Sequence, residues 1–297
     1  MLICLKKISA SMSNLLITGS KGQLGLELAS LKSDFSNYTF FFTDKSNLDI
    51  TNFEAVSTFI SANNIDVIIN CAAYTNVDKA EEEPELANEI NHLSVKNLAE
   101  IAKKLQLKLV HISTDYVFEG NSKIPYSEKA ITNPQNVYGS SKLKGEEAIL
   151  KVHPQNSIII RTSWLYSKFG KNFVKTMLNL SKEKDSISVV SDQIGTPTNA
   201  ADLAKTILQI IPLLKSDGVQ IYHYANKGAC SWFQFAEEIV KLSNNSCKVL
   251  PISSVEFNAK SKRPTYSLLN SDKIQQTFKL KIPHWQSSLA ACISKLK

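Results

Sequence analysis

Long apolar runs are missing from this chain of 297 residues. No stretch approaches the roughly 20 apolar residues that a membrane-spanning helix needs, so we expect no membrane span. The first eleven residues, MLICLKKISAS, hold an apolar run that is too short for a signal peptide and is interrupted by Lys6 and Lys7. We therefore expect either that Met12 is the natural start or that residues 1–11 form a disordered extension.

Cysteine is also scarce. The five cysteines are odd in number and widely spaced, and none forms a CxxC pair: Cys4, Cys71, Cys230, Cys247 and Cys292. This pattern indicates neither a disulfide framework nor a zinc site. A reducing cytoplasm fits it best.

Charge of one sign is not concentrated anywhere. The net charge is +7, but the lysines are scattered and no long basic block is present, so we expect no nucleic-acid partner. A mildly basic protein suits a diphosphate-bearing substrate. The apolar content of 43% is ordinary for a globular protein, and the length fits one large domain or two lobes.

The first half of the chain alternates short apolar runs with helical patterns. We expect helices near 23–31, 52–62 and 85–105 and around Tyr138, and strands at 15–18, 38–43, 66–70, 108–113 and 157–161. The runs are apolar throughout, as in strands covered on both faces. This alternation predicts an α/β fold, a Rossmann-like doubly wound parallel sheet.

Beyond Trp164 the alternation weakens, and tryptophans and prolines appear in mixed segments. We interpret this region as a smaller C-terminal substrate-binding lobe of residues 166–197 and 226–297. The NAD(P)-binding domain would then span 12–165, with a return segment at about 198–225. No Pro-, Gly- or Ser-rich linker separates the two, so we expect them to pack together.

A glycine loop follows the first predicted strand and opens a helix. Its sequence is Gly19-Ser-Lys-Gly22-Gln23-Leu24-Gly25. Gly19 can make the tight turn, Gly22 admits a pyrophosphate and Gly25 permits close packing of helix on strand. The helix N-terminus favours phosphate charge. The GxxGxxG spacing resembles that of short-chain dehydrogenases/reductases and indicates a nicotinamide cofactor.

The choice between NADH and NADPH stays open. Asp44 ends the second strand, where a carboxylate binds the adenosine ribose hydroxyls of NADH. Lys45 and Ser46 follow at once and can accommodate the 2′-phosphate of NADPH.

Two further segments are candidate cofactor contacts. Asp49 and Ile50 would flank the adenine, and Ala72, Ala73 and Tyr74, past the third strand, would line the nicotinamide side. The alternative for the small residues is ordinary packing.

Tyr138 and Lys142 are four residues apart on a predicted helix and share one face. The ammonium can lower the pKa of the phenol from about 10 by roughly 1–3 units and can also bind the nicotinamide ribose. Thr114, at the end of the fourth strand, can donate to a carbonyl oxygen while Tyr138 protonates it. The three residues predict a carbonyl reduction site. Alone, the Tyr–Lys pair would be an ordinary surface pair.

Four other residues are candidate substrate contacts. Asp115 and Tyr116 follow Thr114, although Asp115 could instead cap a turn. Trp164 offers an indole that suits the apolar face of a deoxysugar, unless it is a core residue. Arg263 can pair with a diphosphate, or lie on the surface before Pro264.

Several longer motifs together resemble the dTDP-4-dehydrorhamnose reductases. They run in order from residue 14 to the end: GSKGQLG, INCAAYTNVDKAEEEPELA, HISTDYVFEG, IPYSEKAITNPQNVYGSSKLKGE, IIIRTSWLYSKFGKNFVKTML, SDQIGTPT and a late KRP. The resemblance implies reduction of the 4-keto group of dTDP-4-dehydro-L-rhamnose. It assigns substrate contacts to Thr114, Asp115 and Trp164.

The resemblance also bears on magnesium and on assembly. Some members of the family bind Mg²⁺ through carboxylates at a dimer interface, and Glu27 resembles one such position. Near the second position this chain has Ala201, with Asp202 beside it. We therefore assign no metal ligand, leave open whether Mg²⁺ binds, and expect a monomer or a homodimer.

Two alternatives remain open. One is a reductase or epimerase of another dTDP- or UDP-deoxysugar, which would use identical machinery. The other is a non-catalytic regulatory subunit like those that partner methionine adenosyltransferase. The presence of Thr114, Tyr138 and Lys142 argues against the second, because a scaffold does not need proton-transfer groups.

Overall fold

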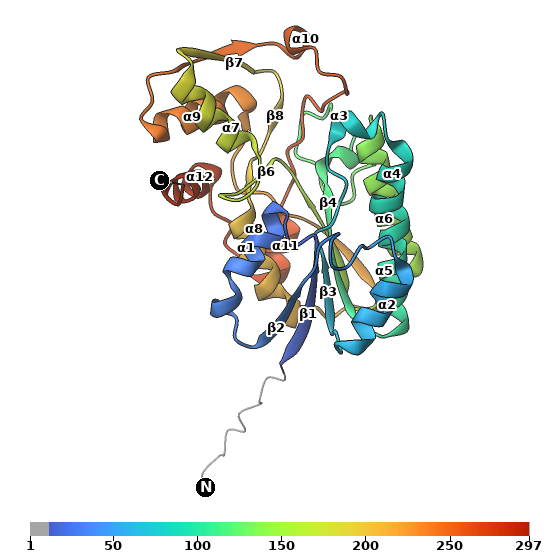
Figure 1. Ribbon diagram of the computed structural model, residues 1–297. Coiled ribbons are helices and arrows are strands. Elements are labelled where there is room, and N and C mark those ends of the chain that lie inside the picture. Colours follow the sequence, from blue (N-terminus) through green and yellow to red (C-terminus); the bar gives the residue numbers. More distant parts are fainter. Residues whose placement is uncertain (1–11, 297) are drawn as a thin grey trace.

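Six parallel strands form the central sheet of the chain, for which a computed structural model describes residues 12–296 (Figure 1). Their spatial order is β10 (Val219–His223), β5 (Ser157–Thr162), β4 (Lys108–Thr114), β3 (Val67–Asn70), β1 (Ser13–Thr18) and β2 (Tyr38–Phe42). The order reverses between β1 and β3, where ligands of doubly wound sheets bind. The predicted doubly wound parallel sheet is confirmed; the prediction for residues 1–11 lies outside the described residues.

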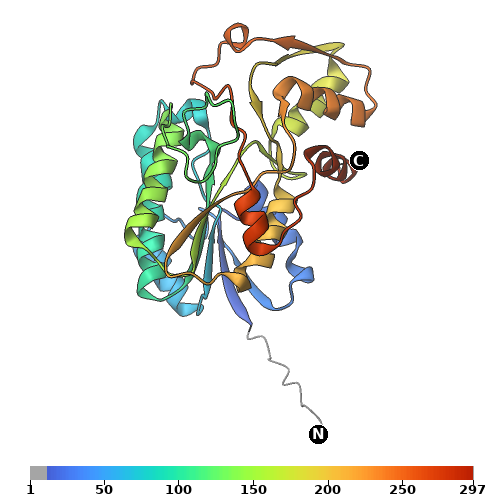
Figure 2. The ribbon, with the colours of Figure 1, turned by 180° about the vertical axis from the view of Figure 1, so that it is seen from behind.

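Helices cover both faces of the sheet (Figures 1 and 2). Leu15 and Ile17 pack with one set of helices and Leu16 with the other, as expected for alternating side chains. The first set comprises α1 (Gln23–Ser30), α8 (Ala200–Ile210) and α11 (Asp272–Phe278). The second comprises α2 (Phe53–Ala62), α5 (Ser94–Lys104) and α6 (Val137–Val152). Burial on both sides explains why these strands are apolar throughout.

The predicted helix over 85–105 is interrupted. It consists of α4 (Pro84–Asn88), a π-helical turn η2 (Glu89–Leu93) and α5. Asn91, in the π turn, bonds both backbone groups of Tyr74 and donates to the hydroxyl of Ser141 at 2.9 Å. The side chain of Asn91 therefore links the π turn to α6 and to the segment after β3.

A second group of elements stands above the carboxyl ends of the strands (Figure 1). Its core includes Val174, Phe235 and Leu289. These residues lie on α7 (Phe173–Glu183), α9 (Trp232–Ser243) and α12 (Trp285–Ser294). Two strands, β7 (Ser186–Val190) and β12 (Lys248–Ile252), pair in parallel. In the chain, β12 is followed by α10 (Ser254–Phe257).

Short elements join these parts. Two strand pairs form small ladders: β6 (Leu165–Tyr166) with β9 (Thr198–Asn199), and β8 (Ile194–Gly195) with β11 (Cys230–Ser231). The remaining helical turns are η1 (Lys32–Asp34), α3 (Val77–Ala80), η3 (Asp115–Val117) and η4 (Ile211–Leu213).

The division of the chain into lobes stays a prediction, but two contacts bear on its boundaries. The return segment supplies α8 and the edge strand β10 to the sheet. Helix α11 also packs on the sheet, because Ile274 shares a core with Ile17 and Leu28. That helix therefore belongs with the sheet, although it lies within 226–297. Across residues 12–296, no helix combines the length and apolar character needed to cross a bilayer.

Candidate active site

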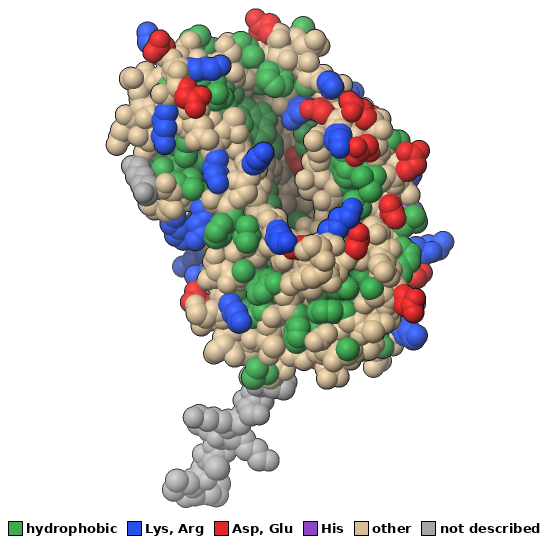
Figure 3. All heavy atoms as spheres, viewed as in Figure 1, with side chains coloured by type: hydrophobic (Ala, Val, Ile, Leu, Met, Phe, Trp, Pro, Cys, Tyr) green, Lys and Arg blue, Asp and Glu red, His purple; other side chains and the backbone are tan. Residues whose placement is uncertain are grey.

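A cleft of about 860 Å³ lies between the carboxyl ends of the strands and the upper elements (Figure 3). This volume is within the range of small-molecule sites. All predicted site residues except Tyr74 line it. Basic residues also line it: Lys21, Lys45, Lys142, Lys171 and Arg263. The cleft is therefore suited to a ligand that carries phosphates.

The glycine loop forms one wall of the cleft. Gly19 has a φ of +63°, and a Cβ there would lie 2.7 Å from the Cα of Ala72. A Cβ on Gly25 would lie 2.5 Å from the Cα of Ser20, so α1 can pack against the loop only with glycine at that position. Helix α1 begins at Gln23 and turns its free backbone N–H groups toward the cleft. These residues fit a dinucleotide pyrophosphate.

Asp44 and Lys21 form an ion pair at this wall. Lys21 Nζ lies 2.6 Å from Asp44 Oδ2, and the hydrogen bond from Lys21 lowers the pKa of Asp44 to about 2. Asp49 and Ile50 line the same end of the cleft. The sequence reasoning missed Lys21, which lies inside the glycine loop. Together with Lys45, it places two cations beside the predicted ribose site.

Ala72 and Ala73 line the cleft, but Tyr74 does not. The phenol of Tyr74 donates to Glu83 Oε2 at 2.8 Å, and its backbone is held by Asn91. The phenol is therefore held by Glu83, and the place of Tyr74 on the nicotinamide side stays a prediction. The competing partner, Glu83, lies at the start of α4, which could not be placed from the sequence.

Lys142 and Tyr138 lie on α6, whose first turn is capped by Asn136 accepting from the N–H of Gly139 at 2.8 Å. Lys142 is buried, and its Nζ donates to the carbonyl of Ile112 at 2.6 Å. The pKa of Tyr138 is raised to about 12, mainly by burial, while its contact with Thr114 lowers it. The predicted lowering by Lys142 is therefore wrong, because that side chain is directed at β4.

Thr114 and Asp115 form a polar pair on the floor of the cleft. Thr114 Oγ1 donates to Asp115 Oδ1 at 3.0 Å and accepts from the N–H of Tyr116 at 3.2 Å. Thr114, rather than Asp115, therefore caps the short helix η3. Asp115 Oδ2 is buried and has no hydrogen-bond partner among residues 12–296, and burial raises the pKa of this carboxyl to about 6.

Tyr116 completes this part of the cleft. Its ring meets that of Tyr138 edge to face, with the centroids 5.5 Å apart. This contact fixes the orientation of both rings beside Thr114.

Trp164 stacks on Trp232, and both indoles line the cleft. The ring centroids are 3.7 Å apart and the planes differ by 11°. Trp164 has a φ of +47°, an unfavourable conformation for a bulky residue that is typical of functional sites. Gly195 makes room for the indole, since a Cβ there would lie 2.6 Å from Trp164 Cε2. The sequence reasoning noted Trp232 but did not place it in the site.

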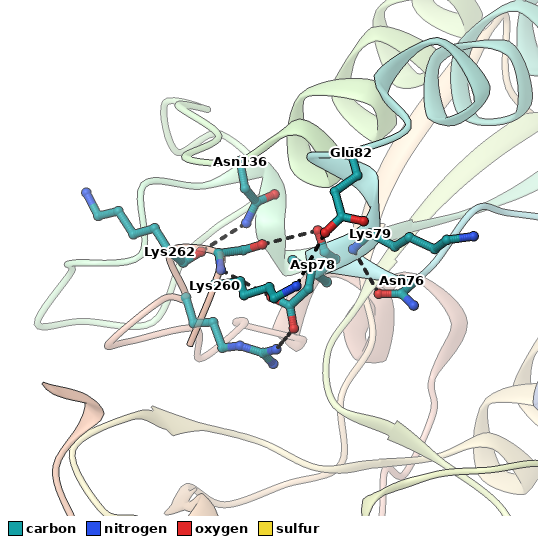
Figure 4. Close-up of polar contacts among 10 residues, drawn as sticks. Asn76, Asp78, Lys79, Glu82, Asn136, Lys260 and Lys262 are labelled. Atoms are coloured by element: carbon teal, nitrogen blue, oxygen red, sulfur yellow. Dashed lines mark hydrogen bonds and ion pairs between the residues drawn. The ribbon is translucent and has the colours of Figure 1, made fainter. Parts of the chain in front are cut away.

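Arg263 lines the cleft and is paired with a carboxylate. Its Nη2 lies 3.0 Å from Asp78 Oδ2. Asp78 Oδ1 also accepts from the N–H of Ser261 at 3.2 Å, and Asn136 Nδ2 donates to the carbonyl of Lys262 at 3.1 Å (Figure 4). The segment from Lys260 to Arg263 therefore crosses from the upper elements to α3 and α6.

The two acidic residues considered for magnesium have partners within the chain. Glu27 is buried and accepts from Ser167 Oγ at 2.5 Å. Asp202 accepts from Ser288 Oγ at 2.5 Å and from Asn226 Nδ2 at 2.9 Å. Within residues 12–296, no group of three or more His, Cys, Asp or Glu side chains could hold a metal ion.

With this geometry established, the chain can be compared with known proteins. The family model described as RmlD substrate binding domain matches residues 12–297. A dTDP-4-dehydrorhamnose reductase of Aggregatibacter actinomycetemcomitans is 42% identical over 287 residues, which cover 94% of this chain and 97% of that protein. A dTDP-4-keto-6-deoxy-D-glucose reductase of Streptomyces niveus is 34% identical over 275 residues, covering 92% and 94% of the two chains.

The structural comparison agrees. A crystal structure of dTDP-4-dehydrorhamnose reductase from Bacillus anthracis, in complex with NADP, aligns with a TM-score of 0.90. It is 41% identical, and the alignment covers 95% of this chain and 99% of that one.

Proposed function

We propose, from the premise that this chain belongs to the dTDP-4-dehydrorhamnose reductase family, that it reduces the 4-keto group of dTDP-4-dehydro-L-rhamnose to give dTDP-L-rhamnose. The members of this family are oxidoreductases. The observation that carries the proposal is the meeting of Thr114, Tyr138 and Lys142 in one cleft, which the stacked tryptophans also line.

NADPH or NADH, when bound, supplies the hydride. The N-terminus of α1 and the glycine loop would hold the pyrophosphate, and Asp44 with Lys21 would contact the adenosine ribose. Lys142 reaches the floor of the cleft, where its Nζ can donate to the hydroxyls of the nicotinamide ribose.

Tyr138 and Thr114 would act together on the sugar carbonyl. The phenol of Tyr138 holds its proton at neutral pH, because its pKa is raised to about 12. It can donate that proton to the oxygen as negative charge develops there, while Thr114 Oγ1, once it leaves Asp115, donates a hydrogen bond to the same oxygen. Thr114 is buried and Tyr138 is half-buried, so both interactions are stronger than they would be in bulk water.

The rest of the cleft would hold the nucleotide sugar. The Trp164–Trp232 stack offers an apolar wall for a deoxysugar. The unpartnered Asp115 Oδ2 can accept from a sugar hydroxyl, and Arg263 can pair with the diphosphate once it leaves Asp78.

A single coupled assay tests this function. The purified chain is mixed with dTDP-4-dehydro-L-rhamnose and either NADPH or NADH, loss of the reduced nicotinamide is followed by absorbance, and the product is identified by NMR. We expect consumption of the cofactor and formation of dTDP-L-rhamnose. No oxidation of either cofactor would overturn the proposal.

One alternative rests on a specific relative. The Streptomyces niveus protein is named for a different keto-sugar, dTDP-4-keto-6-deoxy-D-glucose. The same assay with that sugar separates the two, because the preferred substrate will show the higher kcat/KM. A regulatory subunit, in contrast, would oxidise neither cofactor with any ketosugar and would copurify with a synthetase.

A further inference from the structure

A chain of four buried polar side chains extends from Lys142 into the interior below the cleft. Thr18 Oγ1 lies 2.6 Å from Asn70 Oδ1, Asn70 Nδ2 lies 3.0 Å from His111 Nδ1, and His111 Nε2 lies 3.3 Å from Lys142 Nζ. None of the four is more than 2% exposed. They come from β1, β3, β4 and α6, so the chain crosses three adjacent strands. Thr18, Asn70 and His111 have no part in the proposed reaction itself.

The first two contacts fix the orientation of the amide of Asn70. The N–H of Ala72 donates to Thr18 Oγ1 at 3.4 Å, so the Thr18 hydroxyl accepts there and donates to Asn70. A separation of 2.6 Å is typical of O–H···O and short for N–H···O. The amide oxygen therefore faces Thr18, and the amide nitrogen donates to His111.

This orientation selects one tautomer of His111. Its Nδ1 accepts from Asn70 and carries no proton. The imidazole is neutral, because full burial and the neighbouring Lys142 lower the pKa of His111 well below its usual 6.5. The proton of the neutral ring is then on Nε2, and this N–H is directed at Lys142 Nζ.

The Nε2–H group discriminates between the two forms of Lys142. A neutral amine can accept from it through its lone pair, whereas an ammonium would set one donor against another. The other groups around Lys142 are Ile112, whose carbonyl accepts from Nζ, and the titratable Cys71 and Glu146. Burial lowers the pKa of Lys142 to about 8, against opposing effects of Glu146 and Cys71. Glu146 is already paired with Arg161 at 2.6 Å.

We propose that His111 is a positioning residue for Lys142: Thr18 and Asn70 hold its imidazole with the proton on Nε2, and this N–H keeps Lys142 ready to release a proton. The proposal rests on the function proposed above, in which Lys142 contacts the nicotinamide ribose and Tyr138, on the same helix, donates the proton. A lysine that ionises near neutral pH can return a proton toward Tyr138 after each turnover. In this proposal Thr18, Asn70 and His111, which lie below the cleft, influence the protonation of Lys142.

The tautomer is tested directly by ¹⁵N NMR of protein labelled in its imidazole rings, without cofactor or substrate. The signals of His111 are identified by their loss in His111→Gln. We expect a neutral ring with the proton on Nε2. A proton on Nδ1, or on both nitrogens at pH 7, overturns the proposal.

The coupling to Lys142 is tested by the pH dependence of NADPH binding, measured by fluorescence above pH 7. Lys142→Met identifies the decrease in affinity that is due to Lys142, because that decrease should be missing from this variant. The wild type should show its midpoint near pH 8. Thr18→Val removes the donor that orients Asn70, so the amide can turn and His111 Nε2 can accept from the ammonium.

We expect this midpoint to rise by about one pH unit in Thr18→Val, a tenfold change in proton affinity. Thr18→Ser keeps the hydroxyl and should retain the wild-type midpoint. Equal midpoints in Thr18→Val and the wild type overturn the proposal. Neither readout uses the sugar, so failure of the proposed substrate to react leaves this test intact, and failure of this test leaves the assay of activity intact.

Discussion

At the scale of single residues, burial dominates the acid–base chemistry of the cleft. Tyr138 lies four residues before Lys142 on α6, yet its pKa is raised rather than lowered. This is because the phenol is desolvated and Lys142 Nζ donates to the carbonyl of Ile112. Asp115 shows the same effect, with a pKa raised to about 6. Both side chains therefore keep their protons up to a higher pH than exposed groups of their kind do.

We expect Tyr138→Phe to lower kcat by roughly 10²–10⁴-fold, because the substitution removes the proton donor and keeps the ring. The affinity for NADPH should stay unchanged, as measured by fluorescence titration. Lys142→Ala serves as the comparison and should impair both quantities. Near-normal turnover of Tyr138→Phe would show that the proton comes from another group.

Asp115 makes stability depend on pH in a defined direction. Because its pKa in the folded state is above the usual 3.8, the fold favours the neutral acid, and stability is lost as pH rises from about 4 through 6. Asp115→Asn removes this loss. We compare the free energy of unfolding of the variant with that of the wild type at two pH values. The difference, variant minus wild type, should be larger at pH 7.5 than at pH 4 by up to about 3 kcal/mol.

Urea denaturation at the two pH values measures this gain. The same difference between variant and wild type at both pH values would contradict the assignment.

At the scale of elements, the contact between the π turn η2 and α6 places the catalytic helix. Gly145 lies on α6 where the carbonyl of Asn91 approaches most closely; a Cβ there would lie 2.2 Å from that oxygen. Ser141, one turn earlier on α6, accepts from the side chain of Asn91. The helix that carries Tyr138 and Lys142 is thus held by a backbone contact that admits only glycine.

We expect Gly145→Ala to destabilise the fold by about 1–3 kcal/mol net, because overpacking against backbone outweighs the helix propensity that alanine adds. Chemical denaturation measures this change. Lys144→Ala, on the exposed side of the same helix, is the matched control and should stay within about 0.5 kcal/mol of wild type. Equal stability of the two variants would show that α6 and η2 can move apart at little cost.

At the scale of the whole molecule, the segment from Lys260 to Arg263 ties the upper elements to the sheet domain beside the cleft. Asp78 is the central partner, because it accepts from the N–H of Ser261 and pairs with Arg263. Lys260 adds a weaker contact with Glu82 at 3.4 Å (Figure 4). In the proposed function, this tie would determine how Arg263 meets the diphosphate of the substrate.

We expect Asp78→Ala to raise the KM for the dTDP-sugar by roughly 5- to 10-fold, equivalent to about 1 kcal/mol of binding, and to leave kcat nearly unchanged. The Tm should change little, because the side chains of Arg263 and Asp78 are 31% and 37% exposed and such pairs add little stability. Steady-state kinetics and thermal unfolding measure the two effects. Lys79→Ala is the control, since the ion pair of Lys79 among residues 12–296 is with Glu83, within its own segment. An unchanged KM in Asp78→Ala would show that the tie has no part in binding.

The sequence by itself determined the doubly wound sheet, the glycine loop and the pair on α6. Each depends on local rules: strand and helix periodicity, the need for glycine at a turn, and the i,i+4 spacing that puts Tyr138 and Lys142 on one face. Each strand, the glycine loop and the Tyr138–Lys142 pair are complete within about ten residues of chain. The longer motifs, in their order along the chain, indicated the family.

Only the tertiary structure decided the surroundings of those residues. The phenol of Tyr74 donates to Glu83, Trp232 stacks on Trp164, and Arg263 meets Asp78, 185 residues away in sequence. The pKa of Tyr138 depends likewise on which segments exclude water from it. The physical reason is that desolvation, stacking and ion pairing act between atoms in contact, and contacts between distant segments do not exist until the chain has folded.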